Sequence, residues 1–198
     1  MPVESVESPE DSHVHLGADE ELSSLMERHG YLVLRPAEDS FQRIVLSILR
    51  QQVSMASADA MRERLFSKFE VDPENILAAN TSELQNVGLS EAKSEYIRNV
   101  AEAFQENGWS REYFDQMADG EVVDELTEVR GVGPWTAKMY LQFGLGRQDV
   151  FPVEDLGIRQ AMEAMYGLSS VGEMQSHAEE WAPYRSIASL YLWRFTEE

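Results

Sequence analysis

The stretch that decides the fold of this chain is Leu126–Lys138, which reads LTEVRGVGPWTAK. Leu126 and Val129 have helical spacing before the glycines, and Pro134 suits the first position of a second helix after them. The Gly-Val-Gly sequence between two helices therefore predicts a tight hairpin. Glycines allow positive φ angles and the close approach of another backbone, and the amides that start the second helix can bind an anion. We expect that anion to be a DNA phosphate.

Helical periodicity continues along most of the chain. Apolar spacing predicts helices near residues 19–29, 40–52, 56–69, 73–79, 81–87, 91–107, 112–117, 121–129, 134–143, 156–166, 171–181 and 184–195. Thr81 and Ser90 suit N-caps, and Gly108, Gly144 and Gly167 suit helix ends. Only the short run at residues 31–34 is expected to be extended. No alternating strand pattern competes, so the sequence predicts an all-α fold.

The composition bounds the class of protein. A length of 198 residues with 43% hydrophobic content suits one domain, or two lobes that share an interface. No apolar run approaches a membrane span, and the acidic N-terminus lacks the features of a signal peptide, so a soluble cytoplasmic protein is expected. The absence of cysteine excludes disulfides and thiolate metal sites, and no histidines pair at ligand spacing, so we expect no structural metal. Residues 1–15 are rich in Ser, Glu and Pro and are expected to be a disordered acidic tail.

The charge balance weighs against a polyanionic partner. The chain has 16 basic and 36 acidic residues, a net charge of −20. Residues 1–21 carry seven acids and neither Lys nor Arg, which leaves −13 for the rest, and only three of the basic residues are lysines. Such a composition fits a cytoplasm of very high salt, where phosphate repulsion is screened over about 3 Å. We therefore expect a halophilic source. The alternative is an acidic mesophilic protein whose partners are not nucleic acids.

The segment Leu126–Lys138 resembles the helix-hairpin-helix of the DNA glycosylase superfamily that carries a Gly/Pro-rich loop and a downstream aspartate (HhH-GPD), and most of all its 3-methyladenine DNA glycosylase II (AlkA-like) branch. Further motifs of that branch follow in order at Phe41–Ser54, Val87–Lys93, Phe151–Asp155 and Trp181–Trp193. Together they span roughly residues 30–196. The resemblance implies two helical lobes with an active-site cleft between them. Residues 38–142 would form the central lobe with the hairpin, and residues 16–37 plus 143–198 the lobe with the catalytic aspartate.

The same resemblance implies a function. It is that of a monofunctional glycosylase, which hydrolyses the N-glycosidic bond of alkylated purines such as 3-methyladenine or 7-methylguanine in double-stranded DNA and so initiates base excision repair. Two alternatives stay open. The same fold acts on mismatched uracil or thymine, or on oxidised guanine, in other relatives, and a bare helix-hairpin-helix also occurs in non-catalytic DNA-binding modules. A monomer that needs no cofactor is expected, although hairpin carbonyls could hold Na⁺ or K⁺.

Asp155 matches the essential aspartate of the family. As the glycosidic bond stretches, positive charge develops on the sugar, and an ionised carboxylate stabilises that charge and can activate a water molecule. An alkylated purine already carries positive charge, so it leaves without a strong general acid and one carboxylate is enough. By itself Asp155 is also a good N-cap for the helix that follows. The two roles are compatible because a cap is held rigidly.

The expected base pocket is aromatic, because a cationic purine gains about 0.5–2 kcal/mol from each ring face. Trp193 aligns with the pocket tryptophan of the family. Trp135 is either a pocket wall or a core residue, and its indole stands where relatives with lyase activity have a lysine amine, which predicts no lyase activity. Met139 stands where some relatives have an aromatic wall. Tyr140 and Tyr191 are expected to compensate for that loss, and for Tyr191 the alternative is a core stripe shared with Leu190 and Phe195.

The expected DNA contacts fall at two places. Gln52, with Gln51 beside it, occupies the wedge position that fills the hole left by a flipped base. The alternative for either glutamine is a helix end paired to its own backbone. At the hairpin we expect phosphates to meet the amides of Gly131, Gly133 and Trp135 and the side chains of Arg130 and Lys138.

Overall fold

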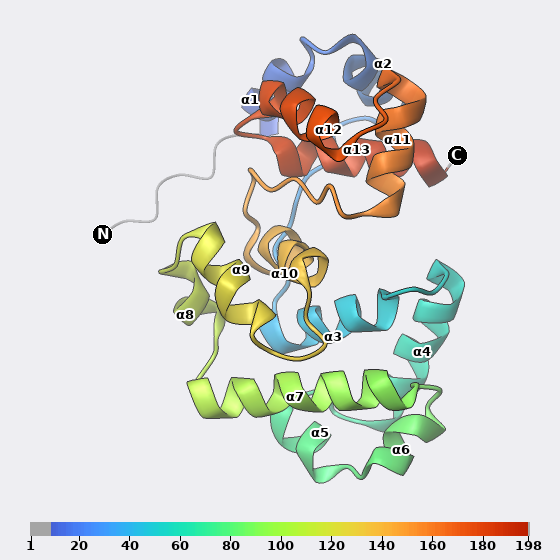
Figure 1. Cartoon of the computed structure of the whole chain (residues 1–198), viewed down its shortest axis with the longest axis vertical. Helices are drawn as coiled ribbons and strands as arrows, with labels where there is room; N and C mark the ends of the chain where they lie inside the picture. Colours follow the sequence, from blue (N-terminus) through green and yellow to red (C-terminus); the bar gives the residue numbers. More distant parts are fainter. Residues whose placement is uncertain (1–8, 198) are drawn as a thin grey trace. The chain divides into compact units, whose positions relative to one another are not determined.

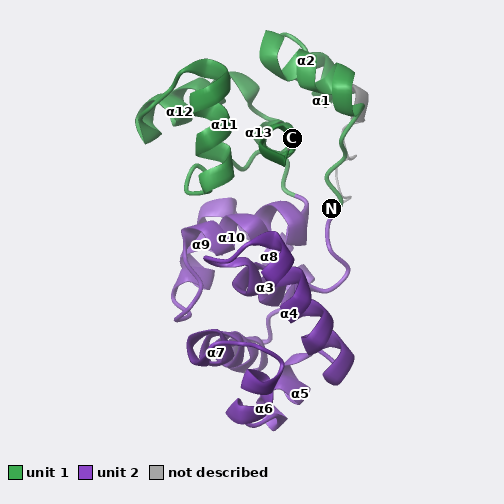
Figure 2. Cartoon of the chain, turned by 90° about the vertical axis from the view of Figure 1, so that its right-hand side faces the viewer, with its two compact units in different colours: residues 1–35, 147–198 green, residues 36–146 purple. Residues whose placement is uncertain are grey.

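The computed structural model describes residues 9–197, and these contain helices but no strand. The all-α prediction is confirmed. The chain divides into two compact units, shown in two colours in Figure 2: unit 2 comprises residues 36–146, and unit 1 comprises residues 1–35 and 147–198. The boundaries lie two and four residues from those expected for the central lobe. Within the described residues, no helix is both long and apolar enough to cross a membrane.

Unit 2 is built around α3 (Ser40–Arg50), which packs on α7 (Glu91–Asn107) and on α10 (Pro134–Tyr140), as Figure 1 shows. Its other helices are α4 (Met55–Lys68), α5 (Pro73–Ala78), α6 (Thr81–Asn86), α8 (Arg111–Asp115) and α9 (Asp119–Thr127). A chain of rings runs through the core, with neighbouring centroids 5.2 to 5.5 Å apart: Phe41, Phe104, Trp109, Phe114 and Tyr140. Edge-to-face and tilted ring pairs of this kind add to the stabilisation from apolar burial.

Unit 1 joins both ends of the chain around α13 (Arg185–Glu197), which packs on α2 (Glu20–His29) and α11 (Leu156–Tyr166). The unit also contains α1 (Pro9–Leu16), α12 (Val171–Ala178) and a short 3₁₀ turn, η2 (Glu179–Trp181). Asp19 links these parts. Its carboxylate caps α2 at the Leu22 amide (3.0 Å) and accepts hydrogen bonds from the Tyr166 hydroxyl and the Trp181 indole, both at 2.9 Å. The two ends of the chain therefore share one core.

The prediction of a disordered tail over residues 1–15 is wrong for Pro9–His15, which lie in α1. Ser12 and His13 are buried, and the Nε2 atom of His13 lies 3.0 Å from the Tyr191 hydroxyl. The segment is helical although its sequence has no apolar period, because a few contacts with residues distant in sequence hold it. Tertiary contacts of this kind override local propensity. Residues 1–8 of the predicted tail lie outside the described residues.

The predicted helix caps are confirmed at Ser90, Gly108 and Gly167. They are wrong at Thr81, since Asn80 caps α6, and at Gly144. The chain there continues from α10 into a π-helical segment, η1 (Leu141–Leu145), and turns at Gly146 with a φ of 77°. A Cβ atom on Gly144 would lie 2.4 Å from the Tyr140 ring. Gly144 therefore serves the packing of an aromatic side chain rather than the end of a helix.

Candidate active site and nucleic-acid interface

Asp155 is the N-cap of α11, as predicted. Its Oδ1 atom accepts a hydrogen bond from the Ile158 amide at 3.1 Å. The same oxygen accepts a second hydrogen bond from the Nε1 atom of Trp193 at 2.9 Å. Trp193 lies on α13, 38 residues along the chain, and reaches the carboxylate because α13 packs on α11. Unit 1 therefore brings together the predicted catalytic residue and the predicted pocket tryptophan.

A glycine in the first turn of α11 leaves room for this pair of side chains. A Cβ atom on Gly157 would lie 3.2 Å from Asp155 Oδ1 and 3.3 Å from Trp193 Cδ1. Both distances are shorter than ordinary van der Waals contact. Sequence reasoning missed Gly157, although a signal was present, because glycine in a helix is unfavourable by about 1 kcal/mol relative to alanine and so invites a local reason.

The arrangement orients a carboxylate with two donors of different origin. The amide comes from the helix that Asp155 caps, and the indole comes from a separate helix, so the carboxylate plane is restrained from two directions. An acid held in this way can stabilise positive charge that develops next to it without reorganising during the reaction. Glu154, one residue earlier, is exposed.

The two hairpin glycines in unit 2 have different structural roles. Gly131 has a φ of 105°, and a Cβ atom there would lie 2.2 Å from the ring of Tyr96 on α7. Gly133 has an ordinary φ of −101° as the N-cap of α10, and no heavy atom lies within 4 Å of its Cβ position. The positive φ that glycine allows is therefore found at Gly131, and the space that a side chain would need there is filled by Tyr96. The open side of the hairpin is at Gly133.

Two hairpin carbonyls are held by side chains from other helices. Asn99 of α7 donates from Nδ2 to the Arg130 carbonyl at 3.0 Å, and Gln51 donates from Nε2 to the Gly131 carbonyl at 2.9 Å. Gln51 also donates to the Thr136 hydroxyl at 3.0 Å. The Gln51 side chain thus pairs with the hairpin and not with its own helix, contrary to the alternative drawn from the sequence. It holds the hairpin in place from the end of α3.

One face of α7 supports both predicted DNA contacts. Lys93, Tyr96 and Asn99 follow one another at a spacing of three residues, which places them on one side of the helix. Lys93 donates to the Leu49 carbonyl near the end of α3 at 2.6 Å, and burial lowers its pKa. Tyr96 and Asn99 meet the hairpin. The helix therefore fixes the end of α3 relative to the hairpin inside unit 2.

Gln52 has an unusual backbone. The helix α3 ends at Arg50, two residues earlier than expected, and Gln52 is exposed with a φ of 54°. Within residues 9–197 it is the one residue other than glycine with a positive φ. A left-handed conformation in a non-glycine residue costs free energy and is found disproportionately at functional sites. This backbone is consistent with the wedge prediction, and the structure around it is rigid because Gln51 and Leu49 are both held.

The remaining predicted residues divide between core and surface. Tyr140 and Tyr191 are fully buried. The Tyr140 hydroxyl donates to Ser40 at 2.8 Å and burial raises its pKa to about 12, whereas the Tyr191 hydroxyl accepts from the Leu32 amide and donates to the Gly30 carbonyl. These contacts favour the core alternative for Tyr191, and Tyr140, which was expected in the pocket wall, is buried in the core of unit 2. Met139 is also buried, Trp135 and Lys138 are half-buried, and Arg130 is exposed and pairs with Glu95.

Comparison with known proteins places these features in one family. The protein-family model described as "HhH-GPD superfamily base excision DNA repair protein" matches residues 45–184. YfjP of Bacillus subtilis is 31% identical over 89% of this chain and 66% of its own length, so the chain spans about two thirds of that relative. A solved structure of Schizosaccharomyces pombe 3-methyladenine DNA glycosylase (Mag1) with abasic DNA has a TM-score of 0.86 at 27% identity, covering 95% of this chain and 97% of that one. DNA-3-methyladenine glycosidase from Bacillus halodurans has a TM-score of 0.78 at 31% identity, covering 99% and 93%.

The family match spans more than half of the chain and includes the hairpin, Gln51, Gln52 and Asp155. The chain therefore belongs to the HhH-GPD superfamily of base excision DNA repair proteins.

Proposed function

We propose that this protein is a monofunctional DNA glycosylase that hydrolyses the N-glycosidic bond of alkylated purines, of the 3-methyladenine and 7-methylguanine type, in double-stranded DNA. The observation that carries the proposal is the Asp155 carboxylate held by Ile158 and Trp193. It occurs in a chain of this repair superfamily, and two of the solved structures that it resembles are named for 3-methyladenine. A carboxylate of fixed orientation is what this reaction needs most.

In the proposed reaction, Asp155 acts on the sugar and not on the base. As the bond between C1′ and the purine nitrogen stretches, the electron pair leaves with the base, and positive charge spreads over C1′ and the ring oxygen. The carboxylate stabilises that charge and takes a proton from the water molecule that adds to C1′. An alkylated purine is already cationic, so its departure neutralises it and requires no second acid.

The proposal includes a limit on the reaction. Strand cleavage by relatives with lyase activity needs an amine that forms a Schiff base with the sugar, and this chain has the indole of Trp135 at the matching position. Lys138 lies three residues further along α10. We expect the product to be an abasic site with an intact backbone.

The DNA contacts proposed for unit 2 follow from its open surfaces. No heavy atom lies within 4 Å of the Cβ position of Gly133, which leaves room for a phosphate at the start of α10, with Lys138 one turn further along the helix and Trp135 between them. Gln52 is proposed as the wedge. A monovalent cation at the hairpin would share carbonyls that already accept hydrogen bonds, since those of Val129, Arg130 and Gly131 are each engaged. No other cofactor enters the proposal.

The proposal is tested by base release from duplexes that each contain a single 7-methylguanine, 3-methyladenine, hypoxanthine, uracil or 8-oxoguanine, in KCl of about molar strength. We expect release of the two alkylpurines and strand cleavage only after alkali. Release of uracil or 8-oxoguanine alone would contradict the substrate class. Cleavage without alkali would contradict the absence of lyase activity. Tight duplex binding with no release of any base would favour a non-catalytic module.

A further inference from the structure

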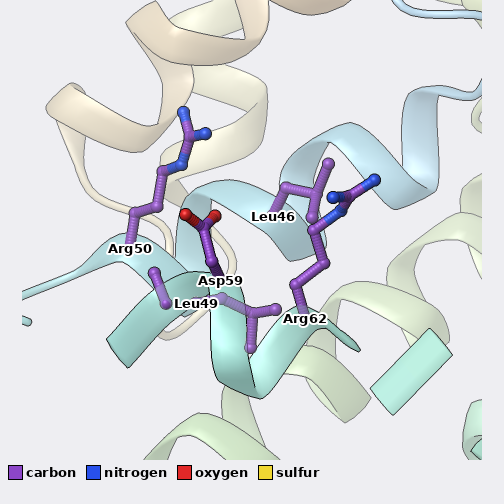
Figure 3. Close-up of a pocket in the computed structure, with 6 residues that line it drawn as sticks. Leu46, Leu49, Arg50, Asp59 and Arg62 are labelled. Carbon is purple, nitrogen blue, oxygen red and sulfur yellow. The ribbon is translucent and has the colours of Figure 1, made fainter. Parts of the chain in front are cut away.

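A small cleft opens in unit 2 where α3 ends and α4 begins, directly beside the Gln52 turn. Its volume is about 250 Å³, and it is lined by Leu46, Leu49, Arg50, Ala58, Asp59 and Arg62. Leucine and alanine side chains form its apolar part, and the three charged residues are exposed. In Figure 3, Asp59 stands between the two arginine side chains, and all three charged ends are directed to the same side. Neither the catalytic residue nor the hairpin contributes to this cleft.

Within the described residues, the two arginines of the cleft have no carboxylate partner, in contrast to Arg130 and Arg185. The chain has 36 acidic residues for 16 basic ones, so carboxylates that can pair with an arginine are plentiful. Arg130 and Arg185 each form such ion pairs. Among the described residues, neither Arg50 nor Arg62 forms an ion pair, although Asp59 lines the same cleft. Their guanidinium donors therefore face solvent in a strongly acidic protein.

A third arginine lies nearer the start of α3 and outside the cleft. Arg43, two turns before Arg50 on α3, is buried, and its pKa falls to about 10 because of that burial and, to a smaller extent, the charge of Arg50. Arg62 lies over the Phe66 ring at 5.8 Å, which leaves the planar edge of its guanidinium group for other partners. Arginines that repel one another and form no ion pair with a carboxylate of the chain can bind an anion from another molecule.

The neighbouring surface is of the kind that enters a nucleic-acid groove. Val53 and Met55 are among the few large apolar side chains that the described structure exposes, at 40% and 54%. They follow the strained backbone of Gln52, and Arg50 precedes it by two residues. Two residues of extended chain span at most about 7 Å, so a group at Arg50 lies close to whatever Gln52 enters. A duplex has stacked bases between two rows of phosphates. The apolar side chains of this surface can contact the bases while the guanidinium groups beside them contact the phosphates.

We propose that Arg50 and Arg62 form a second DNA phosphate site, on the wedge side of unit 2 and separate from the hairpin. The proposal rests on the proposed function, because it takes the Gln52 turn to enter a duplex. Arginine binds phosphate through parallel N–H donors, and both side chains have donors available. Asp59 moderates the site. Its carboxylate offsets the repulsion between the guanidinium groups in the free protein and competes with the phosphate, so it limits the affinity for undamaged DNA.

The first test is the salt dependence of binding to an undamaged duplex, over about 0.1 to 1 M KCl. Each lost phosphate contact lowers the slope of log affinity against log salt by about 0.9. We expect the Arg50→Gln/Arg62→Gln variant to lose about 1.8 from that slope, and each single variant about half as much. Lys68→Gln, which removes the same charge from the far end of α4, is the matched control and should keep the wild-type slope. A double variant with the wild-type slope and affinity would overturn the proposal.

Asp59→Asn provides a test in the opposite direction. Removal of the competing carboxylate should tighten duplex binding by about three- to tenfold at low salt, and this gain should vanish when Arg50 and Arg62 are both glutamine. A gain of function cannot arise from a damaged fold. Unchanged or weaker binding by Asp59→Asn would contradict the role given to this carboxylate.

Methylphosphonate linkages, which remove the charge of one phosphate at a time, identify the strand. Placed singly along each strand, they should weaken wild-type binding at one or two positions and leave binding by the double variant unchanged at those positions. The strand that contains these positions is the one that the arginines contact. If the two proteins respond alike at every position, the site does not exist. Base release by the wild type judges the proposed function separately, since a glycosylase with no arginine-dependent phosphate would keep its activity.

Discussion

At the scale of single residues, the Asp155 carboxylate is restrained by two donors that can be changed one at a time. The Ile158 amide belongs to the helix cap, and the Trp193 indole belongs to α13. Gly157 provides the space in which they meet. We therefore expect stability and the proposed catalysis to depend on different parts of this small cluster, so that substitutions can separate them.

Gly157→Ala should slow base release without weakening the fold. The new Cβ atom would lie 3.2 Å from Asp155 Oδ1 and would displace the carboxylate or the indole by a few tenths of an ångström. A displacement of that size should lower kcat about tenfold, whereas alanine in a helix should hold or raise the melting temperature. Gly120→Ala is the matched control, because Gly120 is also the second residue of its helix and has no heavy atom within 4 Å of its Cβ position. Equal rates for the two variants would argue against the steric role of Gly157.

Trp193→Phe should separate orientation of the acid from stacking on the base. Phenylalanine keeps an aromatic face but loses the Nε1 donor to Asp155. Loss of a hydrogen bond to a charged group costs about 1.5–3 kcal/mol, so the single-turnover rate should fall about 10- to 150-fold. The affinity for an abasic duplex should change little. A variant with the wild-type rate would show that the indole N–H does not position the carboxylate.

At the scale of helices and their connections, the hairpin is held in place by neighbouring helices. Side chains of α3 and α7 hold two of its carbonyls, and Tyr96 fills the space beside Gly131. Only Gly133 presents an open backbone. The two glycines of the motif should therefore respond differently to the same substitution.

Gly131→Ala should destabilise the protein, and Gly133→Ala should not. At Gly131 an alanine meets both a φ of 105° and the Tyr96 ring, so the free energy of unfolding should fall by about 2–4 kcal/mol. At Gly133 the change should be below about 0.5 kcal/mol, but the added methyl group should weaken binding to all duplexes alike. Urea denaturation and duplex titration measure the two effects. Equal stability of the two variants, or unchanged DNA binding by Gly133→Ala, would contradict these roles.

The sequence predicted the elements well because their signals are local. Apolar spacing and caps such as Ser90 and Asp155 lie within one helical turn of the structure that they specify. The contacts that make the site are not local. Trp193 meets Asp155 across 38 residues, and Gln51 meets Gly131 across 80. The helix α1 was missed for the same reason, since His13 contacts the distant Tyr191. At the π-helical segment, the sequence predicts a helix end at Gly144, whereas this glycine makes room for the Tyr140 ring.

At the scale of the whole chain, the net charge of −20 destabilises the folded state. Like charges repel one another more strongly when the chain is compact, and salt screens this repulsion. Residues 22–198 alone carry −13. The halophilic origin that we expect from this composition therefore predicts that salt stabilises the fold, in addition to its effect on DNA binding.

The melting temperature should rise with KCl up to molar concentrations. Relief of about 2–3 kcal/mol of self-repulsion between about 0.1 and 2 M KCl corresponds to about 5–10 °C for a chain of this length. An uncharged osmolyte at equal osmolarity should give a smaller rise, because it acts by exclusion from the surface and does not screen charge. A melting temperature that is flat or falls with KCl would contradict a high-salt adaptation.

The central claim is that the Asp155 carboxylate performs the chemistry. Its most direct test is the single-turnover release of 7-methylguanine from a duplex by the wild type and by Asp155→Asn. Asparagine is also a good N-cap and can accept from Ile158 and Trp193, so the fold and duplex affinity should be retained. We expect the rate to fall at least about 10³-fold while the affinity stays unchanged. Release by Asp155→Asn within about tenfold of the wild-type rate would contradict it.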